Sequence, residues 1–312
     1  MRDALLRDFS QLDGMEIITT YDTRVSLSAL ALQAIEIDEK SNPMQIWREL
    51  LQCCDMALVI APETGGVLTE LTKMLEASPA KNLGSNEYAV NITSDKYATF
   101  QLLETAGIQT ITTCMANAWS ELNTTSNATH GYIVKPNNGA GCEDTVYCRD
   151  MATLQAWLDL HPHKLATYII QPYQVGTPAS MSILCKNGRA WLLSCNQQKI
   201  AIDNTEFLQD MIQYEGSIVN GLNQHRAAFS KLANSIAQAL PELNGYVGVD
   251  IVVDGEAVYV VEINPRITTS YIGLYDSLNY NPAQLILDLA CKPTFKLPKN
   301  LTANMIDISL HG

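Results

Sequence analysis

Basic residues are scarce in this chain of 312 residues. Twenty Lys and Arg stand against 33 Asp and Glu, which gives a formal net charge of −13 at pH 7. Affinity for DNA or RNA depends on cationic side chains that neutralise phosphates. The composition therefore argues against a nucleic-acid partner, while a small anion can still bind at a local basic site.

Long apolar runs are also missing. The longest, such as Met56–Ala61 and Trp191–Cys195, are far shorter than the ~20 residues that span a bilayer. The first residues, Met-Arg-Asp-Ala-Leu-Leu-Arg-Asp, contain acids and lead into no continuous apolar segment, unlike a signal peptide. We therefore expect no membrane partner.

Several motifs for metal binding and nucleophilic catalysis are absent. The eight cysteines form no C-x-x-C pair, and there is no Gly-x-Ser-x-Gly elbow. This pattern favours reduced thiols and a cytoplasmic protein over a disulfide framework or a zinc site. The histidines are scattered, and the pair His161 and His163 is expected in a solvated loop.

The first ninety residues alternate helical and extended patterns. We expect helices over Arg2–Leu12, Met44–Cys53 and Val67–Ala77, and strands over Met15–Thr20 and Met56–Ala61. Strand, glycine-bearing turn and helix are the rhythm of a doubly wound α/β domain, predicted here for residues 1–92. Such domains usually begin with a strand, whereas this chain begins with a helix, so we expect a sheet without its first strand.

The rest of the chain has an α+β pattern. A helix capped by Ser94 or Asp95 and closed by Gly107 is expected first. Further helices are predicted over Met151–Leu160 and Gln224–Leu240, and strands over Tyr132–Val134, Thr167–Ile170, Ser180–Leu184, Arg189–Ser194, Val247–Val253 and Ala257–Ile263.

Lys135 ends a predicted strand and precedes a loop that contains Gly139 and Gly141. Glycines let backbone N–H groups converge on phosphate oxygens, and a lysine adds a positive charge. The loop lacks the Gly-Lys-Ser/Thr end of a Walker loop, and Asp144 replaces the third glycine of the dinucleotide fingerprint. Taken alone, the pattern is compatible with phosphate binding or with an ordinary β-turn.

Acidic and amide side chains gather on the last predicted hairpin. Glu262 and Asn264 are two residues apart on a strand and therefore share a face. Asp250 joins that face if the loop has an odd number of residues, as in a three-residue loop with Gly255 left-handed. The apolar residues Val247, Val249, Ile251, Val253, Val261 and Ile263 are then expected on the opposite face. Two carboxylates and an amide oxygen suit Mg²⁺; the alternative is a solvated outer face.

A third candidate is the strand exit Gln171-Pro172-Tyr173-Gln174. An adenine ring needs a backbone carbonyl and a backbone N–H, which Pro172 and Gln174 can supply, although an ordinary strand end is the alternative. Asn196 and Gln198 alternate with apolar neighbours and are further candidates for nucleotide contact.

The order of these features resembles the ATP-grasp superfamily of carboxylate ligases, over about residues 91–288. The resemblance implies a small subdomain, 93–173, and a large subdomain with a C-terminal tail, 174–312. It implies ATP and Mg²⁺ as cofactors, with Mn²⁺ as an alternative. The site residues implied are Lys96, Lys135, Gly139 and Gly141 for phosphates, Gln171, Pro172, Tyr173, Gln174 and Gln198 for the nucleotide, Asp250, Glu262 and Asn264 for the metal, and Arg266 with Lys135 for catalysis. Gln171 and Pro172 occupy positions that are often acidic in the superfamily.

Within the superfamily, the chain looks most like the tyramine–glutamate ligases and their relatives, which build methanofuran-type C1-carrier cofactors. The residues that carry this likeness include Ala61-Pro62-Glu63-Thr64, Ser180-Met181-Ser182, Asn196-x-Gln198 and the run from Asn264 to Tyr271. Members usually have a leading strand and a glycine-bearing turn before the first helix.

The resemblance implies an ATP-dependent ligase that joins a carboxylate, L-glutamate, to tyramine or a tyrosine-like amine through an acyl phosphate. Glu63, Asp22 and Glu143 are candidates for the base that accepts the amine proton. The partners are the small-molecule acid and amine, and a homo-oligomer is left open. The alternatives are another ATP-grasp amino-acid or peptide ligase, a kinase, or a non-catalytic nucleotide sensor. The Asp-Glu-Asn-Arg set argues against the sensor.

Overall fold

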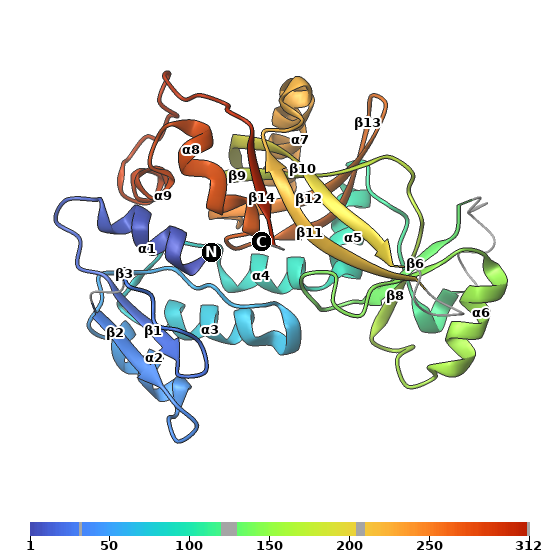
Figure 1. Cartoon of the computed structure of the whole chain (residues 1–312), viewed down its shortest axis with the longest axis horizontal. Coiled ribbons are helices and arrows are strands. Elements are labelled where there is room, and N and C mark those ends of the chain that lie inside the picture. The colour runs from blue at the N-terminus through green and yellow to red at the C-terminus, as the bar shows by residue number, and fades with distance from the viewer. Residues whose placement is uncertain (31–32, 120–129, 204–209, 311–312) are drawn as a thin grey trace.

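The computed structural model describes residues 1–30, 33–119, 130–203 and 210–310, and its N-terminal region alternates helices with short parallel strands (Figure 1). The elements are α1 (Arg2–Ser10), β1 (Ile18–Asp22), β2 (Gln33–Ile37), α2 (Pro43–Leu51), β3 (Met56–Ala57), α3 (Val67–Glu76), β4 (Lys81–Asn82) and α4 (Glu87–Ser94). The helices predicted in this region are confirmed. The strand expected over Met56–Ala61 is wrong in length, because its partner β4 offers only two residues for pairing.

The strands of this region form two separate pairs. β1 lies parallel to β2, and β3 lies parallel to β4. The α/β character of residues 1–92 is therefore confirmed. Within the described residues, however, the strands make two small parallel sheets instead of one continuous doubly wound sheet.

A ten-stranded antiparallel sheet dominates the rest of the described chain. Its order is β13-β12-β9-β10-β11-β7-β6-β8-β5, and β14 pairs with β11. The strands are β5 (Cys114–Met115), β6 (Tyr132–Pro136), β7 (Val146–Cys148), β8 (Tyr168–Pro172), β9 (Thr177–Lys186), β10 (Arg189–Asp203), β11 (Asp210–Val219), β12 (Gly245–Asp254), β13 (Ala257–Asn264) and β14 (Ile306–Ser309).

Helices cover both faces of this sheet. They are α5 (Lys96–Thr105), α6 (Met151–Leu160), α7 (Arg226–Ala239), α8 (Leu274–Leu278) and α9 (Pro282–Cys291). Asp95 caps α5, as one of the two predicted caps, by accepting a hydrogen bond from the Ala98 backbone N–H at 2.7 Å. None of the described helices reaches the length and apolarity that crossing a bilayer requires.

The two faces of the central strands differ in character. On β9, Met181, Ile183 and Cys185 point into the core under α7, while Ser180, Ser182 and Leu184 alternate with them. The second face is apolar at the end where Leu184 and Tyr246 pack under α8 and α9. Its other end carries polar side chains, and this is where the functional cavity lies.

Gly245 marks a close contact between the N-terminal region and the large sheet. Gly245 has a φ of +72°, and a Cβ placed on it would lie 2.1 Å from the carbonyl oxygen of Leu83. Beside it, the Ser85 hydroxyl donates to the Asn244 carbonyl oxygen and accepts from the Asn244 N–H, both at 3.1 Å. A residue without a side chain is therefore required at this junction.

Replacing Gly245 by alanine is expected to destabilise the protein more than replacing Gly14, which has a similar φ of +73° and no atoms within 4 Å of its Cβ position. Both changes are expected to cost ~1–2 kcal/mol of stability, because alanine is strained in a left-handed backbone conformation. Gly245→Ala adds about 1–3 kcal/mol for the steric clash. Urea denaturation of both variants measures this difference, and equal losses of stability would refute the close packing at Leu83.

Candidate functional site

The hairpin of β12 and β13 places the predicted metal ligands together. Asp250 lies directly opposite Glu262, and Asn264 follows Glu262 on the same face at the end of β13. The expected three-residue loop is wrong, because Asp254 pairs with Ala257 and leaves two loop residues, although Gly255 is left-handed. A β-bulge beside Asp250 restores the shared face.

The bulge also moves one predicted core residue. On β13, Val260 lies just before the bulge, where it pairs with Ile251 and is fully buried. Val260 therefore takes the core position that was expected for Val261. Val261 lines the functional cavity instead. The strict alternation used for the prediction fails here because the bulge inserts one unpaired residue into β13.

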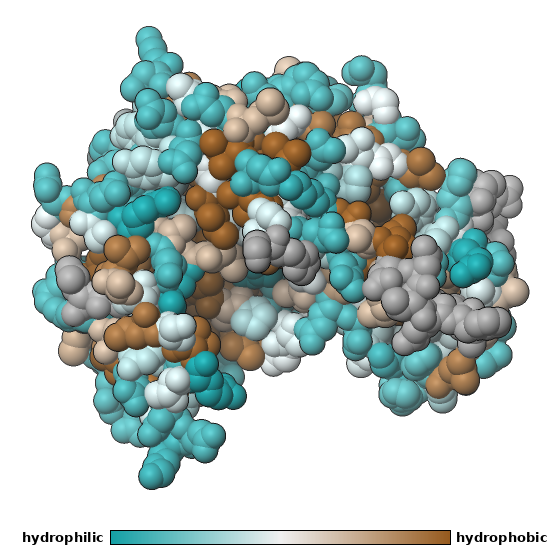
Figure 2. Space-filling view, viewed as in Figure 1, coloured by the Kyte–Doolittle hydropathy of each residue, from teal (hydrophilic) through white to brown (hydrophobic). Residues whose placement is uncertain are grey.

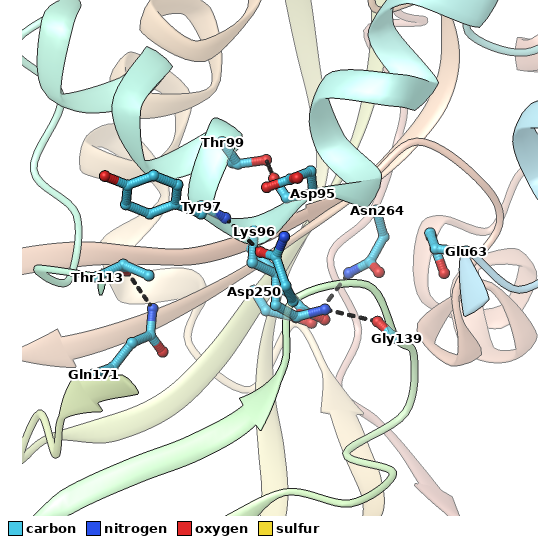
Figure 3. A network of polar contacts seen from close by, with 12 residues as sticks. Glu63, Asp95, Lys96, Tyr97, Thr99, Thr113, Gly139, Gln171, Asp250 and Asn264 are labelled. Carbon is cyan, nitrogen blue, oxygen red and sulfur yellow. Dashed lines mark hydrogen bonds and ion pairs between the residues drawn. The ribbon is translucent and has the colours of Figure 1, made fainter. Parts of the chain in front are cut away.

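Amide side chains surround the Asp250 carboxylate. Gln198 Nε2 donates to Asp250 Oδ1 at 2.8 Å. Asn264 Nδ2 donates to Asp250 Oδ2 at 3.1 Å (Figure 3). Burial, together with the negative charge of Glu262, raises the pKa of Asp250. Burial also opposes ionisation of Glu262, but the ammonium groups of Lys96 and Lys135 outweigh it and lower the pKa of Glu262.

This donor set fits Mg²⁺. Two carboxyl groups face one cavity from directly opposed positions, and the Asn264 side-chain amide lies beside them. Keeping two such carboxylates ionised together is unfavourable without a cation, as the raised pKa of Asp250 indicates. Mg²⁺ prefers this kind of hard-oxygen set and retains positions for water and phosphate.

Lys96 connects the first turn of α5 to the glycine-bearing loop. Its Nζ donates to the Gly139 carbonyl oxygen at 2.7 Å (Figure 3). The same Nζ lies 3.4 Å from Glu262 Oε2. The loop is also held by Asn137, whose carbonyl oxygen accepts from the Lys96 N–H at 3.0 Å. Lys135 is buried on β6, and this burial lowers the pKa of its ammonium group. Both predicted lysines therefore lie at one end of the loop.

The predicted adenine hinge forms the end of β8. Gln171 is buried, and its Nε2 donates to Thr113 Oγ1 at 2.8 Å, which leaves its side-chain oxygen available (Figure 3). The Tyr173 N–H donates to the Gly131 carbonyl oxygen at 2.9 Å. Pro172 and Gln174 both line the cavity, and their backbone contact with an adenine ring stays a prediction.

A cavity of about 260 Å³ brings the predicted site residues together. It is lined by all of them: Lys96, Lys135, Gly139, Gly141, Gln171, Pro172, Tyr173, Gln174, Gln198, Asp250, Glu262, Asn264 and Arg266. In the view of Figure 1, the surface is hollowed between the lobe of α2 and α3 and the lobe of α6 (Figure 2).

Sequence reasoning missed the apolar walls of this cavity. They include Ile111, Ile133, Pro178, Ile200, Ile212 and Val252, together with Tyr214. Ile200 lies on the part of β10 beyond the predicted end at Ser194, and Ile212 and Tyr214 lie on β11, which was not predicted. The alternation of Ile200 with Ile202, and of Ile212 with Tyr214, is the period-two signal that could have revealed both.

Arg266 does not point freely into the cavity. Its Nε donates to Glu63 Oε1 at 2.8 Å and its Nη2 donates to Glu63 Oε2 at 2.7 Å. This pair was not expected, because 203 positions separate the two residues in the sequence. Thr268, Thr269 and Ser270 follow Arg266 along the cavity wall.

The three candidate bases differ in their surroundings. Glu63 is engaged by Arg266, and Asp22 hydrogen-bonds with Arg24 at the surface, which lowers the pKa of Asp22 to about 2. Glu143 is exposed and lines the cavity at the glycine-bearing loop. Of the three, Glu143 alone lines the cavity.

Cysteine and histidine chemistry finds no support in the site. Burial raises the pKa of the Cys142 thiol, which lines the cavity, to about 12. His161 Nδ1 lies 2.8 Å from the carbonyl oxygen of Trp157. Among the described residues, no cluster of three or more His, Cys, Asp or Glu has the arrangement of a metal site, so the metal set proposed above depends on the Asn264 amide.

Two curated proteins resemble the chain over most of its length. Tyramine–L-glutamate ligase of Methanocaldococcus jannaschii is 28% identical over 291 residues, which cover 92% of this chain and 80% of that protein. Its counterpart from Methanocaldococcus fervens is 27% identical over 277 residues, with coverages of 88% and 81%.

Solved structures share the fold at lower identity. An ATP-grasp superfamily protein from Archaeoglobus fulgidus has a TM-score of 0.63 and 23% identity, covering 90% of this chain and 84% of its own. L-amino acid ligase from Bacillus licheniformis has a TM-score of 0.69 and 18% identity, with coverages of 94% and 72%. The biotin carboxylase domain of Hydrogenobacter thermophilus 2-oxoglutarate carboxylase, solved with MgADP, has a TM-score of 0.77 and 15% identity, with coverages of 97% and 70%.

Family models match two consecutive parts of the sequence. Residues 15–90 match the pre ATP-grasp 3 domain, and residues 93–270 match the ATP-grasp domain. The second match spans more than half of the chain and contains the cavity residues from Lys96 to Arg266. The resemblance inferred from the sequence motifs is thereby confirmed, and the chain belongs to the ATP-grasp family of ATP-dependent ligases.

Proposed function

We propose that the protein joins the carboxylate of L-glutamate to the amine of tyramine, or of a tyrosine-like compound, with cleavage of ATP to ADP and phosphate. The observation that carries the proposal is the single cavity in which Lys96, Lys135, the Asp250–Glu262 pair and Arg266 meet. The names of the two curated relatives supply the acid and the amine. The corresponding role is in the biosynthesis of a methanofuran-type cofactor in the cytoplasm.

We assign the nucleotide to the part of the cavity between the hinge and the glycine-bearing loop. Pro172 and Gln174 supply backbone groups for adenine, and Lys96 and Lys135 supply positive charge for the α- and β-phosphates. Mg²⁺, or Mn²⁺ with its similar preference for oxygen, would bind at Asp250, Glu262 and Asn264 and neutralise phosphate oxygens. Arg266 lies two residues beyond Asn264 and faces the acid substrate.

The proposed reaction needs positioning more than covalent help from the protein. An oxygen of the substrate carboxylate forms a bond to the γ-phosphorus, and the bond from that phosphorus to ADP breaks. The amine nitrogen then bonds to the acyl carbon, and the phosphate leaves with the electrons of the C–O bond. The amine loses a proton, for which Glu143 is the accessible acceptor among the three candidates.

Two other activities remain as alternatives within the same fold. A different amino-acid or peptide ligase would use the same residues with another amine, as the likeness to an L-amino acid ligase suggests. A kinase would stop at the phosphorylated acid. Both differ from the proposed reaction in their dependence on the amine.

Phosphate release is expected to require Mg²⁺, ATP, L-glutamate and tyramine together, because the amine must remove the acyl group to complete each cycle. The measurement is a coupled phosphate assay with each component omitted in turn, and mass spectrometry of the product identifies a glutamyl amide. Phosphate release without the amine would favour a kinase. ATP binding with no turnover for any acid and amine would favour a nucleotide sensor.

Replacing Arg266 by alanine is expected to lower turnover about 100-fold, which corresponds to the ~3 kcal/mol of a lost transition-state donor. The KM for ATP should change little, since the proposed nucleotide contacts are made by other residues. Arg24→Ala is the matched control, because it removes an exposed arginine that also pairs with a carboxylate. Unchanged turnover in Arg266→Ala would contradict the assigned role.

A further inference from the structure

The ion pair between Arg266 and Glu63 bridges the two domains of the chain. Glu63 belongs to residues 15–90 and Arg266 to residues 93–270. The Glu63 side chain is 4% exposed and the Arg266 side chain is 12% exposed. Among the described residues, no other ion pair joins residues 15–90 to residues 93–270. The pair of Glu63 and Arg266 is therefore the ion pair that connects these two regions.

Glu63 binds one edge of the Arg266 guanidinium and leaves N–H donors free on the other edge. Glu63 accepts from Nε and from Nη2, and the Ile267 carbonyl oxygen accepts from Nη1 at 3.3 Å. A guanidinium has five N–H donors, so two remain, one on Nη1 and one on Nη2. Arg266 lines the cavity, and these two donors can therefore bind a carboxylate or phosphate there while Glu63 stays in place.

Glu63 itself lies at the start of a hydrogen-bonded turn. It follows β3 and begins the 3₁₀ turn Thr64–Gly66 that leads into α3. The Gly66 N–H donates to the Glu63 carbonyl oxygen at 3.1 Å, and the Leu68 N–H donates to the Pro62 carbonyl oxygen at 3.2 Å. Gly65 and Gly66 have φ values of 66° and 73°, which residues with a side chain adopt only with strain. The turn thus fixes where the Glu63 carboxylate stands.

Arg266 has other acidic neighbours that could capture it. Arg266 follows Asn264 by two residues, and Asn264 Nδ2 donates to Asp250 Oδ2 at 3.1 Å. An unrestrained arginine next to the Asp250–Glu262 pair would turn towards those carboxylates and occupy the proposed metal position. Figure 3 shows Glu63 and Asp250 on opposite sides of Asn264. The two hydrogen bonds from Arg266 to Glu63 therefore hold the guanidinium at a carboxylate other than Asp250.

We propose that Glu63 is a positioning residue that holds Arg266 in the orientation in which it binds the acid substrate. This inference rests on the proposed ligase function. Glu63 is buried and is absent from the cavity wall, whereas Arg266 forms part of it, so Glu63 acts through Arg266 and not on the substrate. The pre-ATP-grasp domain thereby contributes to catalysis through one side chain.

The test is a double-mutant cycle of Glu63→Gln and Arg266→Ala with glutamate, tyramine and Mg-ATP. Glu63→Gln alone is expected to lower kcat about tenfold or more, with the KM for ATP changed less than about twofold. In the Arg266→Ala background the same change is expected to have no further effect, because a residue that acts only through Arg266 has nothing left to orient. Glu63→Asp, which keeps the charge, is expected to recover part of kcat.

Asp307→Asn is the control, since it breaks the exposed pair of Lys199 and Asp307, neither of which lines the cavity, and should leave kcat unchanged. The proposal would be overturned if kcat of the double variant fell by the product of the two single-variant factors. Glu63 would then act independently of Arg266. Unchanged kcat in Glu63→Gln would overturn it as well.

A second readout needs no substrate and separates this inference from the proposed function. A hydrogen-bonded, buried arginine Nε–H exchanges slowly with water, so ¹⁵N-detected spectra of the free protein should show a protected Arg266 signal. That protection is expected to be lost in Glu63→Gln and retained in Asp307→Asn. Its absence in the unsubstituted protein would refute the positioning role. An unsubstituted protein that shows the protected signal but forms no amide would refute only the assigned substrates.

Discussion

Two half-buried carboxyl groups that face each other, Asp250 and Glu262, set the requirement that the rest of the site meets. They lie directly opposite one another on adjacent strands, where like charges repel and water is scarce. The fold compensates with Lys96 beside Glu262, Lys135 beneath the glycine-bearing loop, and the amides of Gln198 and Asn264 around Asp250. A site built in this way favours a bound divalent cation and the phosphates that accompany it.

The compensating groups come from distant parts of the chain, and the antiparallel sheet is what brings them together. Lys96 starts α5, Lys135 lies on β6, and Gln198 lies on β10 beside β9 and two strands from the hairpin of β12 and β13. One face of the central strands is closed by α7, and the other is closed by α8 and α9 over part of its length. Charged side chains can therefore lie at the uncovered polar end of that second face without being buried in the apolar core.

Much of this site could be predicted because its chemistry resides in short local patterns. Lys135 with its glycines, the Glu262–Asn264 spacing and the Gln171–Gln174 exit each depend on residues within a few positions. The β-bulge at Val261 could not be predicted, since nothing in the alternation marks where a strand gains a residue. Strand β11 carries a period-two signal only over Ile212 and Tyr214, and its pairing with β10, β7 and β14 is decided by tertiary contacts that the sequence does not show.

The pairing of Arg266 with Glu63 could not be predicted from the sequence, for a different reason. Glu63 was recognised as part of a motif, but a carboxylate after a strand can serve as a base, a ligand or half of an ion pair. Only the docking of the N-terminal domain, fixed at Gly245 and Ser85, decides among these roles. Since a buried arginine without its carboxylate is costly, the same contact that orients Arg266 also favours the docked arrangement. Stability at the domain junction and order in the active site are thus coupled through one pair of side chains.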